Sequence, residues 1–477
     1  MCTTIIAAEG ATADGSFLLA RSADSSALKA QHFVIHEAAD HPAGALYRTA
    51  DHCGATRFEW PLPARTLRYT TIPNWKTGLH GAAGFNEAGV GVTGTESIFA
   101  RDDALLKDPL NTETGITEDD IADVLLCEAK TAREACALLG RIIEEKGAGE
   151  GFGVGFVDET DIWYLETGTA HQWMARRIPR DMTFASANQG RFKAYSPDDP
   201  SMMASSTLVS FAVEAGLYDP EKDGAFDFSR AYIRDDERDR IYNDPRVWSI
   251  QKILTPALEQ KPDDGRNFPL FTKPGLPVTV DDVKRTLRDH YEGTDHDPYG
   301  ERLNGGEPWR PVSVFRTYEA HILQVRPWLP RPVGEVIRVA FGMADLSCFL
   351  PFYAGLSRVP AQYGLGTDKA DRESVYWKFR KLQTLVMTDY PKLAPVVKKA
   401  FAEFEQKTDG RMAEFEKEYV RLASENPAAA QEALDRFNLG VLAEGEELAE
   451  RLTDEAFTIR TADIESAIFF ANCSKKD

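Results

Sequence analysis

The N-terminal part of the chain alternates short apolar runs with turn residues, a pattern typical of antiparallel strands. Residues 3–8 are apolar or β-branched, an Asp-Gly pair lies in the predicted turn at 13–16, and residues 17–20 form a second apolar run. This spacing predicts a β-hairpin. Its second strand brings the segment that starts at Arg21 back to the first residues of the chain.

Similar runs recur as far as about residue 344, bounded by Gly, Asn, Asp or Pro. One of them is dominated by small residues, which permit the close approach of a neighbouring strand or of a substrate. The expected strands are 90–95, 151–157, 162–167, 171–177, 313–325 and 334–344, with a further apolar segment at 183–191.

Helical periodicity interrupts the strand pattern at several places. These helices are expected to open at residues that can cap the free N–H groups of a first turn. They are expected near Thr117, near Thr131, near Arg246, and over 280–291 with Thr279 or Asp281 as the cap.

From about residue 371 the composition shifts to Lys, Glu, Ala and Leu with a helical period. Four residues are expected to break it into three or four segments: Pro391, Pro395, Gly410 and Pro427. We therefore expect a domain at 1–365 and a helical C-terminal extension at 366–477, packed on the domain or linked to it. The extension either covers the domain within one chain or supplies the interface of a homo-oligomer.

The 477-residue chain has 75 acidic and 55 basic residues and a net charge of −20. This balance argues against nucleic acid or an anionic membrane as a partner and fits a cytoplasmic enzyme. No run of 18 apolar residues is present, and the N-terminus lacks the basic and apolar regions of a signal peptide. The six cysteines have neither CxxC pairs nor zinc-ligand spacing, so they are expected to be reduced.

A cysteine directly follows the initiator methionine. Removal of Met1 would leave Cys2 with both a thiol and a free α-amine, whose pKa of about 7.7–8.0 leaves part of it unprotonated near neutral pH. Nucleophile and general base would then belong to one residue. A cysteine also occurs at this position by chance, so the inference depends on its surroundings.

The predicted hairpin places Arg21 and Asp24 beside Cys2. A guanidinium near the thiol would favour the thiolate, and a carboxylate could hold the α-amine. The alternative is a surface Arg-Asp pair after a strand, which contributes little to stability.

Two other charged clusters are not interpreted as sites. Residues 234–240 mix both signs, which predicts a solvated loop or helix face rather than a binding patch. Asp295, His296 and Asp297 are possible ligands, but no further ligand lies near them in sequence, so we expect a loop rather than a metal site. The HExxH and Gly-x-Ser-x-Gly motifs of zinc peptidases and serine hydrolases are absent.

The order of several short motifs resembles that of the N-terminal-nucleophile (Ntn) cysteine dipeptidases of the dipeptidase A type, relatives of bile salt hydrolase, penicillin V acylase and secernin. Each motif is weak alone, and their order together with Cys2 makes the resemblance specific. The motifs lie at 1–4, 11–16, 21–24, 85–90, 95–97 and 187–189, and weaker matches follow at 246–248 and 351–355.

The resemblance implies an α+β fold, a four-layer αββα sandwich, with a helical C-terminal extension. It implies that Cys2 is the nucleophile, that Arg21 and Asp24 are poised against its thiol and amine, and that the Asn188 amide stabilises the oxyanion. The backbone N–H around Glu96 matches the second donor. Arg246 matches a further active-site arginine loosely, with Arg230 as a competitor. No metal or organic cofactor is required.

The resemblance favours a cysteine dipeptidase that hydrolyses dipeptides or short peptides through an acyl-enzyme. Within the same fold, the alternative enzyme is an acylase of the bile-salt or penicillin V type. The alternative of another class is a non-enzymatic, secernin-like protein. Glu96, the segment at 21–24 and the long helical tail favour the peptidase.

Overall fold

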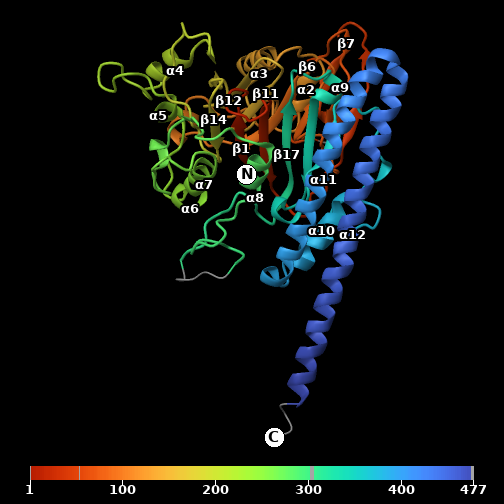
Figure 1. Cartoon of the computed structure of the whole chain (residues 1–477). Helices are drawn as coiled ribbons and strands as arrows, with labels where there is room; N and C mark the ends of the chain where they lie inside the picture. The colour runs from red at the N-terminus through yellow and green to blue at the C-terminus, as the bar shows by residue number, and fades with distance from the viewer. Residues whose placement is uncertain (1, 53, 301–305, 474–477) are drawn as a thin grey trace.

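The computed structural model describes residues 2–52, 54–300 and 306–473, and two large antiparallel sheets form its centre (Figure 1). The first sheet has the strand order β16-β14-β1-β2-β17-β18-β19, so the N-terminal hairpin lies in its middle. Its strands are β1 Thr3–Ala7, β2 Phe17–Asp24, β14 Thr183–Ser186, β16 Phe271–Thr272, β17 Thr317–Val325, β18 Glu335–Phe341 and β19 Leu350–Tyr353.

The second sheet has the strand order β15-β13-β12-β11-β10-β9. Its strands are β9 Ala83–Phe85, β10 Gly91–Ser97, β11 Phe152–Val157, β12 Ile162–Thr167, β13 Trp173–Arg177 and β15 Met202–Ala204. Three two-stranded ladders come from β3 Val34–His36, β4 Ala39–Asp40, β5 Leu46–Arg48, β6 Glu59–Pro61, β7 Arg65–Thr66 and β8 Tyr69–Thr71.

The helices of the first 365 residues have at most 15 residues each. They are α1 Asp102–Leu105, α2 Ile121–Leu126, α3 Ala132–Lys146, α4 Leu208–Glu214, α5 Phe228–Tyr232, α6 Asp239–Tyr242, α7 Asp244–Leu254, α8 Val280–Arg288 and α9 Arg331–Gly334. Short 3₁₀ turns occur at Thr49–His52, Gly265–Asn267, Ala344–Leu346 and Ala361–Gly364. No helix in the described ranges combines the length and apolar composition that a bilayer span needs.

The two sheets contact each other where β2 meets β10 and β11. Helices α2 and α3 pack on the second sheet through a cluster that includes Ile121, Leu139 and Trp163. Helices α7 and α8 pack on the first sheet through a separate cluster that includes Ile5 and Val247. The expected four-layer αββα arrangement of these elements stays a prediction.

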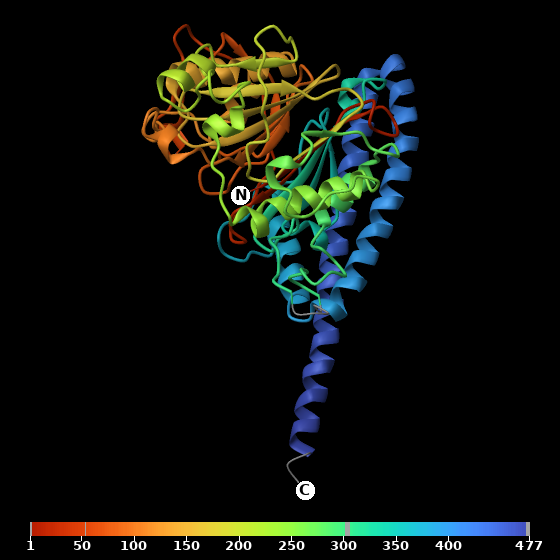
Figure 2. The ribbon, with the colours of Figure 1, turned by 90° about the vertical axis from the view of Figure 1, so that its left-hand side faces the viewer.

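Three long helices complete the chain: α10 Val375–Val386, α11 Tyr390–Glu425 and α12 Pro427–Cys473. Helix α10 contacts β18, α12 contacts β19, and α12 packs along both α10 and α11. In both views α12 continues well past the rest of the molecule (Figures 1 and 2). The α+β class with a helical C-terminal extension is therefore confirmed.

Some expected boundaries were wrong. The helix expected near Thr117 begins at Ile121, because Asp120 accepts hydrogen bonds from the Thr117 backbone and hydroxyl in a turn before the helix. Pro395 and Gly410 do not end a helix, since both lie inside α11. A helix buried along its length, as α11 is through residues such as Phe401, tolerates the few kcal/mol that such residues cost.

Candidate active site

The side chain of Arg21 meets the thiol of Cys2 between the two sheets. In the β1–β2 hairpin Thr3 lies opposite Ser22, which places Cys2 next to the end of β2. Arg21 Nη1 donates a hydrogen bond to Cys2 Sγ at 3.2 Å, and both residues are buried. The hairpin inferred from the turn at 13–16 therefore brings the predicted thiol and guanidinium together.

All five N–H donors of Arg21 have acceptors. Besides the thiol they reach Thr93 Oγ1 at 2.9 Å and the backbone oxygens of Ala82, Gly94 and Thr95 at 2.7–2.9 Å. Burial alone would lower the pKa of Arg21, but the charges of Cys2, Tyr318, Glu319 and Glu118 together outweigh it and raise that pKa. The guanidinium is thus a permanent positive charge fixed against the sulfur.

A chain of hydrogen bonds occupies the same side of the first sheet. Tyr318 is the extra residue of a β-bulge, because β17 pairs Thr317 with Asp24 and Glu319 with Ala23. Bulges re-aim side chains and are frequent next to active sites. The Tyr318 hydroxyl lies 2.6 Å from His80 Nε2.

The other ring nitrogen of that histidine faces a carboxylate. His80 Nδ1 lies 3.2 Å from Glu118 Oε1, and Glu118 also accepts a hydrogen bond from Thr95 Oγ1 at 3.2 Å. Burial, with lesser contributions from Lys29 and Arg21, lowers the pKa of His80 well below its usual value. His80 is therefore neutral near pH 7. The nearby Glu118 carboxylate favours the tautomer with its proton on Nδ1, although Nδ1 makes no hydrogen bond among the described residues, and Nε2 then accepts from the Tyr318 hydroxyl.

Arg246 from α7 binds the opposite side of the nucleophile's backbone. Its Nη1 donates to the Cys2 carbonyl oxygen and to Thr3 Oγ1, both at 2.7 Å, and its Nη2 donates to Asn188 Oδ1 at 3.1 Å. Burial, and then the neighbouring Arg310, lower the pKa of Arg246 to about 9. One buried guanidinium thus joins two predicted site residues, Cys2 and Asn188.

Asn188 is held in a left-handed conformation, with φ of 63°. Such a backbone is uncommon for a residue other than glycine and often marks a functional site. Its amide nitrogen Nδ2 donates to the Ser97 carbonyl oxygen at 2.9 Å, and its backbone N–H donates to Glu96 Oε1 at 2.6 Å. Nδ2 carries two hydrogens, so a second can serve as the predicted oxyanion donor.

The side chain of Glu96 supports Asn188 from within the protein. It also accepts a hydrogen bond from Ser186 Oγ at 2.6 Å, and burial raises its pKa. A bulge lies directly before it, since β10 pairs Gly94 with Val154 and Glu96 with Gly153, which leaves Thr95 outside the register. The expected role of the backbone N–H around Glu96 stays a prediction.

Asp24 lies on the other face of β2 from Arg21, as their spacing in a strand requires. It accepts hydrogen bonds from Thr317 Oγ1 at 2.5 Å and Ser22 Oγ at 3.2 Å, and it pairs with the guanidinium of Arg310. Met1 lies outside the described residues, and the expected hold of Asp24 on the α-amine stays a prediction.

Arg230 was the competitor of Arg246 for the further active-site arginine. Its side chain is 76% exposed and pairs with Asp227, so of these two arginines it is Arg246 that lies near Cys2.

A cavity of about 250 Å³ opens beside Asn188, and the sequence reasoning missed it. Part of its wall comes from the charged segment 234–240, which was expected to be only solvated. The segment is short and irregular, with α6 as its single helical turn, so no periodicity could have placed it. The lining residues are Phe99, Asn188, Arg234, Arg238, Asp239, Tyr242 and Asn243.

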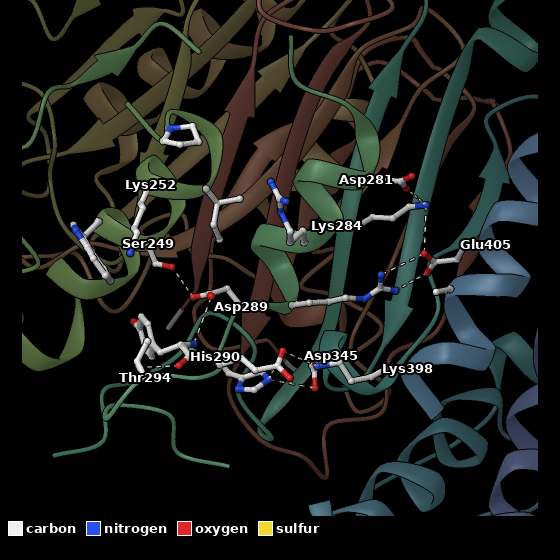
Figure 3. Close-up of a pocket in the computed structure, with 18 of the residues that line it drawn as sticks. Ser249, Lys252, Asp281, Lys284, Asp289, His290, Thr294, Asp345, Lys398 and Glu405 are labelled. Carbon is white, nitrogen blue, oxygen red and sulfur yellow. Dashed lines mark hydrogen bonds and ion pairs between the residues drawn. The ribbon is translucent and has the colours of Figure 1, made fainter. Parts of the chain in front are cut away.

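A larger cavity, of about 740 Å³, lies between α7, α8 and α11 (Figure 3). Its charges neutralise one another: Lys284 approaches Asp281 and Glu405 within 3.0 and 3.4 Å, and Lys398 approaches Asp345 within 2.8 Å. None of the predicted site residues lines it. It is therefore separate from the site around Cys2.

The described ranges contain no group of three His, Cys, Asp or Glu side chains that could hold a metal ion. The expected loop at 295–297 is present, and its side chains make structural contacts. His296 stacks on Trp309 with 3.5 Å between ring centres, and Asp297 lies 2.9 Å from His290.

The site holds a buried thiol against a guanidinium, and the side-chain amide of Asn188 belongs to the same hydrogen-bond network. This combination is typical of the active sites of cysteine hydrolases. The sequence model of Peptidase family C69 matches residues 1–403. The chain belongs to this family and is a hydrolase that acts on peptide bonds. The matched region extends past residue 365 into α11.

Curated relatives agree with this assignment. The chain is 50% identical over 371 residues to a "Probable dipeptidase" of Salmonella dublin, covering 77% of this chain and 83% of that one. It is 30% identical to a "Dipeptidase" of Bifidobacterium longum, covering 80% and 76%. Among solved structures, penicillin V acylase from Agrobacterium tumefaciens matches at 13% identity over 74% of this chain and 86% of that one, with a TM-score of 0.33.

Proposed function

We propose that this protein is a cysteine dipeptidase of the Ntn type, which hydrolyses dipeptides and short peptides through the thiol and α-amine of Cys2. The observation that carries the proposal is the 3.2 Å contact of Arg21 with Cys2 Sγ in a member of a peptidase family whose relatives bear dipeptidase names. We place the catalytic unit at 1–365 and the helical extension at 366–477.

The site supplies each step of acyl transfer. The Cys2 sulfur, held as thiolate by Arg21, attacks the scissile carbonyl carbon. The oxyanion that forms takes a hydrogen bond from Asn188 Nδ2 and from the backbone around Glu96, and each such donor contributes about 3–4 kcal/mol in other acyl-transfer enzymes. Asp24 orients the α-amine, and Arg246 fixes the positions of Cys2 and Asn188.

The α-amine of Cys2 carries each proton that the reaction moves. The α-amine takes the thiol proton and, as ammonium, gives it to the leaving nitrogen when the C–N bond breaks. Water then adds to the thioester carbonyl and gives a proton to the amine. When the C–S bond breaks, the acid leaves and the ammonium returns that proton to the Cys2 sulfur. The network from Tyr318 to Glu118 lies beside this pathway but supplies no proton that the balance needs.

The test is hydrolysis of a dipeptide panel by the purified protein and by Cys2→Ala, with an N-acyl conjugate such as a glycine-linked bile salt in the same assay. We expect dipeptide cleavage that Cys2→Ala abolishes, while both proteins unfold at similar temperatures. Turnover retained in Cys2→Ala would remove Cys2 from the mechanism. Cleavage of the conjugate alone would make the protein an acylase.

We further propose that the chain forms a homo-oligomer through the distal part of α12. Phe457, Ile464 and Ile468 are 64%, 54% and 57% exposed there, and their spacing of seven and four residues places them on one stripe. Light scattering should give a multiple of the chain mass, and the mass should fall on truncation after residue 456. A full-length monomer would exclude the proposal.

We also propose that the protein works in a reducing, cytoplasmic setting. Cys127, Cys136 and Cys348 are buried in the core and form no disulfide, so the fold of the described residues does not depend on oxidised cysteines. Activity that requires an oxidised form of the protein would contradict this.

A further inference from the structure

The cavity beside Asn188 is lined by charged side chains of both signs. We propose that it is the subsite that reads the two charged ends of a dipeptide, with Asp239 facing the α-ammonium and Arg234 facing the carboxylate. The inference rests on the dipeptidase function proposed above and deepens it, because it assigns residues to the recognition of a zwitterionic substrate.

The covalent geometry of a dipeptide limits where such residues can lie. The α-nitrogen is two bonds from the scissile carbonyl carbon, and the carboxylate carbon is three bonds from the same atom. Both charges therefore lie within about 4 Å of the carbon that Cys2 attacks. Groups that read them must line the space directly beside the oxyanion donor, and the cavity at Asn188 meets this condition.

Asp239 is tied to Asn188 through one amide. Asn243 Nδ2 donates to Asp239 Oδ1 at 2.6 Å and to the Asn188 carbonyl oxygen at 3.4 Å. Asn243 Oδ1 in turn accepts from Arg246 Nη2 at 2.7 Å, and Arg246 Nη1 binds the Cys2 carbonyl oxygen. The carboxylate is thus positioned by the same network as the nucleophile.

The side-chain donor that binds Asp239 is the neutral amide of Asn243 rather than a cation. Burial and the charges of Asp244 and Asp236 oppose ionisation of Asp239, and the charge of Arg234 favours its ionised form. The carboxylate is half-buried in the cavity wall. A substrate ammonium would supply the charged donor that strengthens such a hydrogen bond.

Two arginines line the cavity together with Asp239. Arg234 and Arg238 share one acid, Asp236, at 3.5 and 2.9 Å. Arg234 is half-buried and its guanidinium lies 4.6 Å from the centre of the Phe99 ring, which holds it in place. Arg238 is 76% exposed and stands at the rim. A guanidinium fixed by stacking suits a carboxylate, which it can bind through two parallel hydrogen bonds.

Binding is the readout that separates this inference from catalysis. Calorimetry in the Cys2→Ala protein would compare Ala-Ala, N-acetyl-Ala-Ala and Ala-Ala amide. We expect Ala-Ala to bind about 10- to 100-fold more tightly than either capped peptide, the range expected when a charge-assisted hydrogen bond is lost. Adding Asp239→Asn should remove the preference over the acetylated peptide alone, and adding Arg234→Gln should remove the preference over the amide alone.

Matched controls are available on the same segment. Asp235 is 77% exposed and pairs with Arg266, and Arg230 is 76% exposed, so Asp235→Asn and Arg230→Gln should leave all three affinities unchanged. Equal affinities of the three peptides, or selectivity that survives both cavity substitutions, would overturn the inference. If the peptides bind selectively but the unmodified protein does not cleave them, the proposed dipeptidase function is wrong, while the assignment of the subsite still holds.

Discussion

On one side of Cys2 the site is rigid and fully enclosed, and on the other it is open and irregular. Arg21 is 1% exposed, and all its N–H groups donate to the thiol or to four oxygens, three of them in β10 and one at Ala82 just before β9. The cavity at Asn188 is walled by the segment 234–240, whose arginines are half-buried or exposed. The catalytic chemistry is thus assigned to a buried region, and substrate recognition is assigned to a more exposed one.

The contrast shows how one site meets two demands. A thiolate needs a cation whose position does not fluctuate, and strands in the middle of a sheet provide it. A substrate must enter and leave, and surface loops with few buried contacts open at little cost. Substitutions on the two sides should therefore differ in kind, with loss of fold and activity on one side and loss of selectivity on the other.

The largest effect is expected from Arg21→Gln. It removes a buried charge and leaves the carbonyl oxygens of Ala82, Gly94 and Thr95 without their donor, which should lower the free energy of unfolding by about 3–5 kcal/mol. Hydrolysis should also be lost, because no cation remains at the sulfur. Urea denaturation measures the first effect and a dipeptide assay the second.

Arg230→Gln is the matched control for that variant. Its side chain lies on the surface with one acidic neighbour, so stability should change by less than about 0.5 kcal/mol. If Arg21→Gln were as stable as this control, the enclosed side of the site would not be the rigid one.

The enclosed side could largely be predicted from the sequence. An Asp-Gly turn between two apolar runs sets a hairpin, and its length alone places Arg21 opposite the first residues. Thr279 was a recognisable cap, and the structure shows a full capping box with Asp282. Such features depend on residues that are near one another in the chain.

Two bulges on the enclosed side, and the whole of the open side, could not be predicted in the same way. The bulges at Thr95 and Tyr318 follow from the pairing of strands far apart in sequence, and no local pattern marks them. Asp239 is linked to Asn188 only through Asn243, which lies at the start of α7, and α7 contacts β14. A cluster of mixed charges looks the same in sequence whether it is solvated or lines a cavity.

A smaller effect is expected from Tyr318→Phe on the enclosed side. It would leave His80 Nε2 buried without its hydrogen-bond donor, which should lower the free energy of unfolding by about 1–2 kcal/mol. The thiol and guanidinium keep their contact, so hydrolysis should fall far less than in Arg21→Gln. Chemical denaturation with a parallel assay checks both, and an unchanged stability would show that the hydroxyl is not part of this network.

The smallest effect is expected from pH on the open side. Burial, with a lesser contribution from Asp244, raises the pKa of Asp239 to about 6. Its carboxyl is then protonated as pH falls through 6, and its attraction for a substrate ammonium is lost below that value. Other groups titrate in the same range, so the informative quantity is the ratio of kcat/KM between the unmodified protein and Asp239→Asn. This ratio should be constant from pH 7 to 8 and fall by about tenfold on reaching pH 5, one pH unit below that pKa. A ratio independent of pH would mean that the ionised carboxylate does not bind the substrate, and the selectivity of the open side would have to come from its arginines.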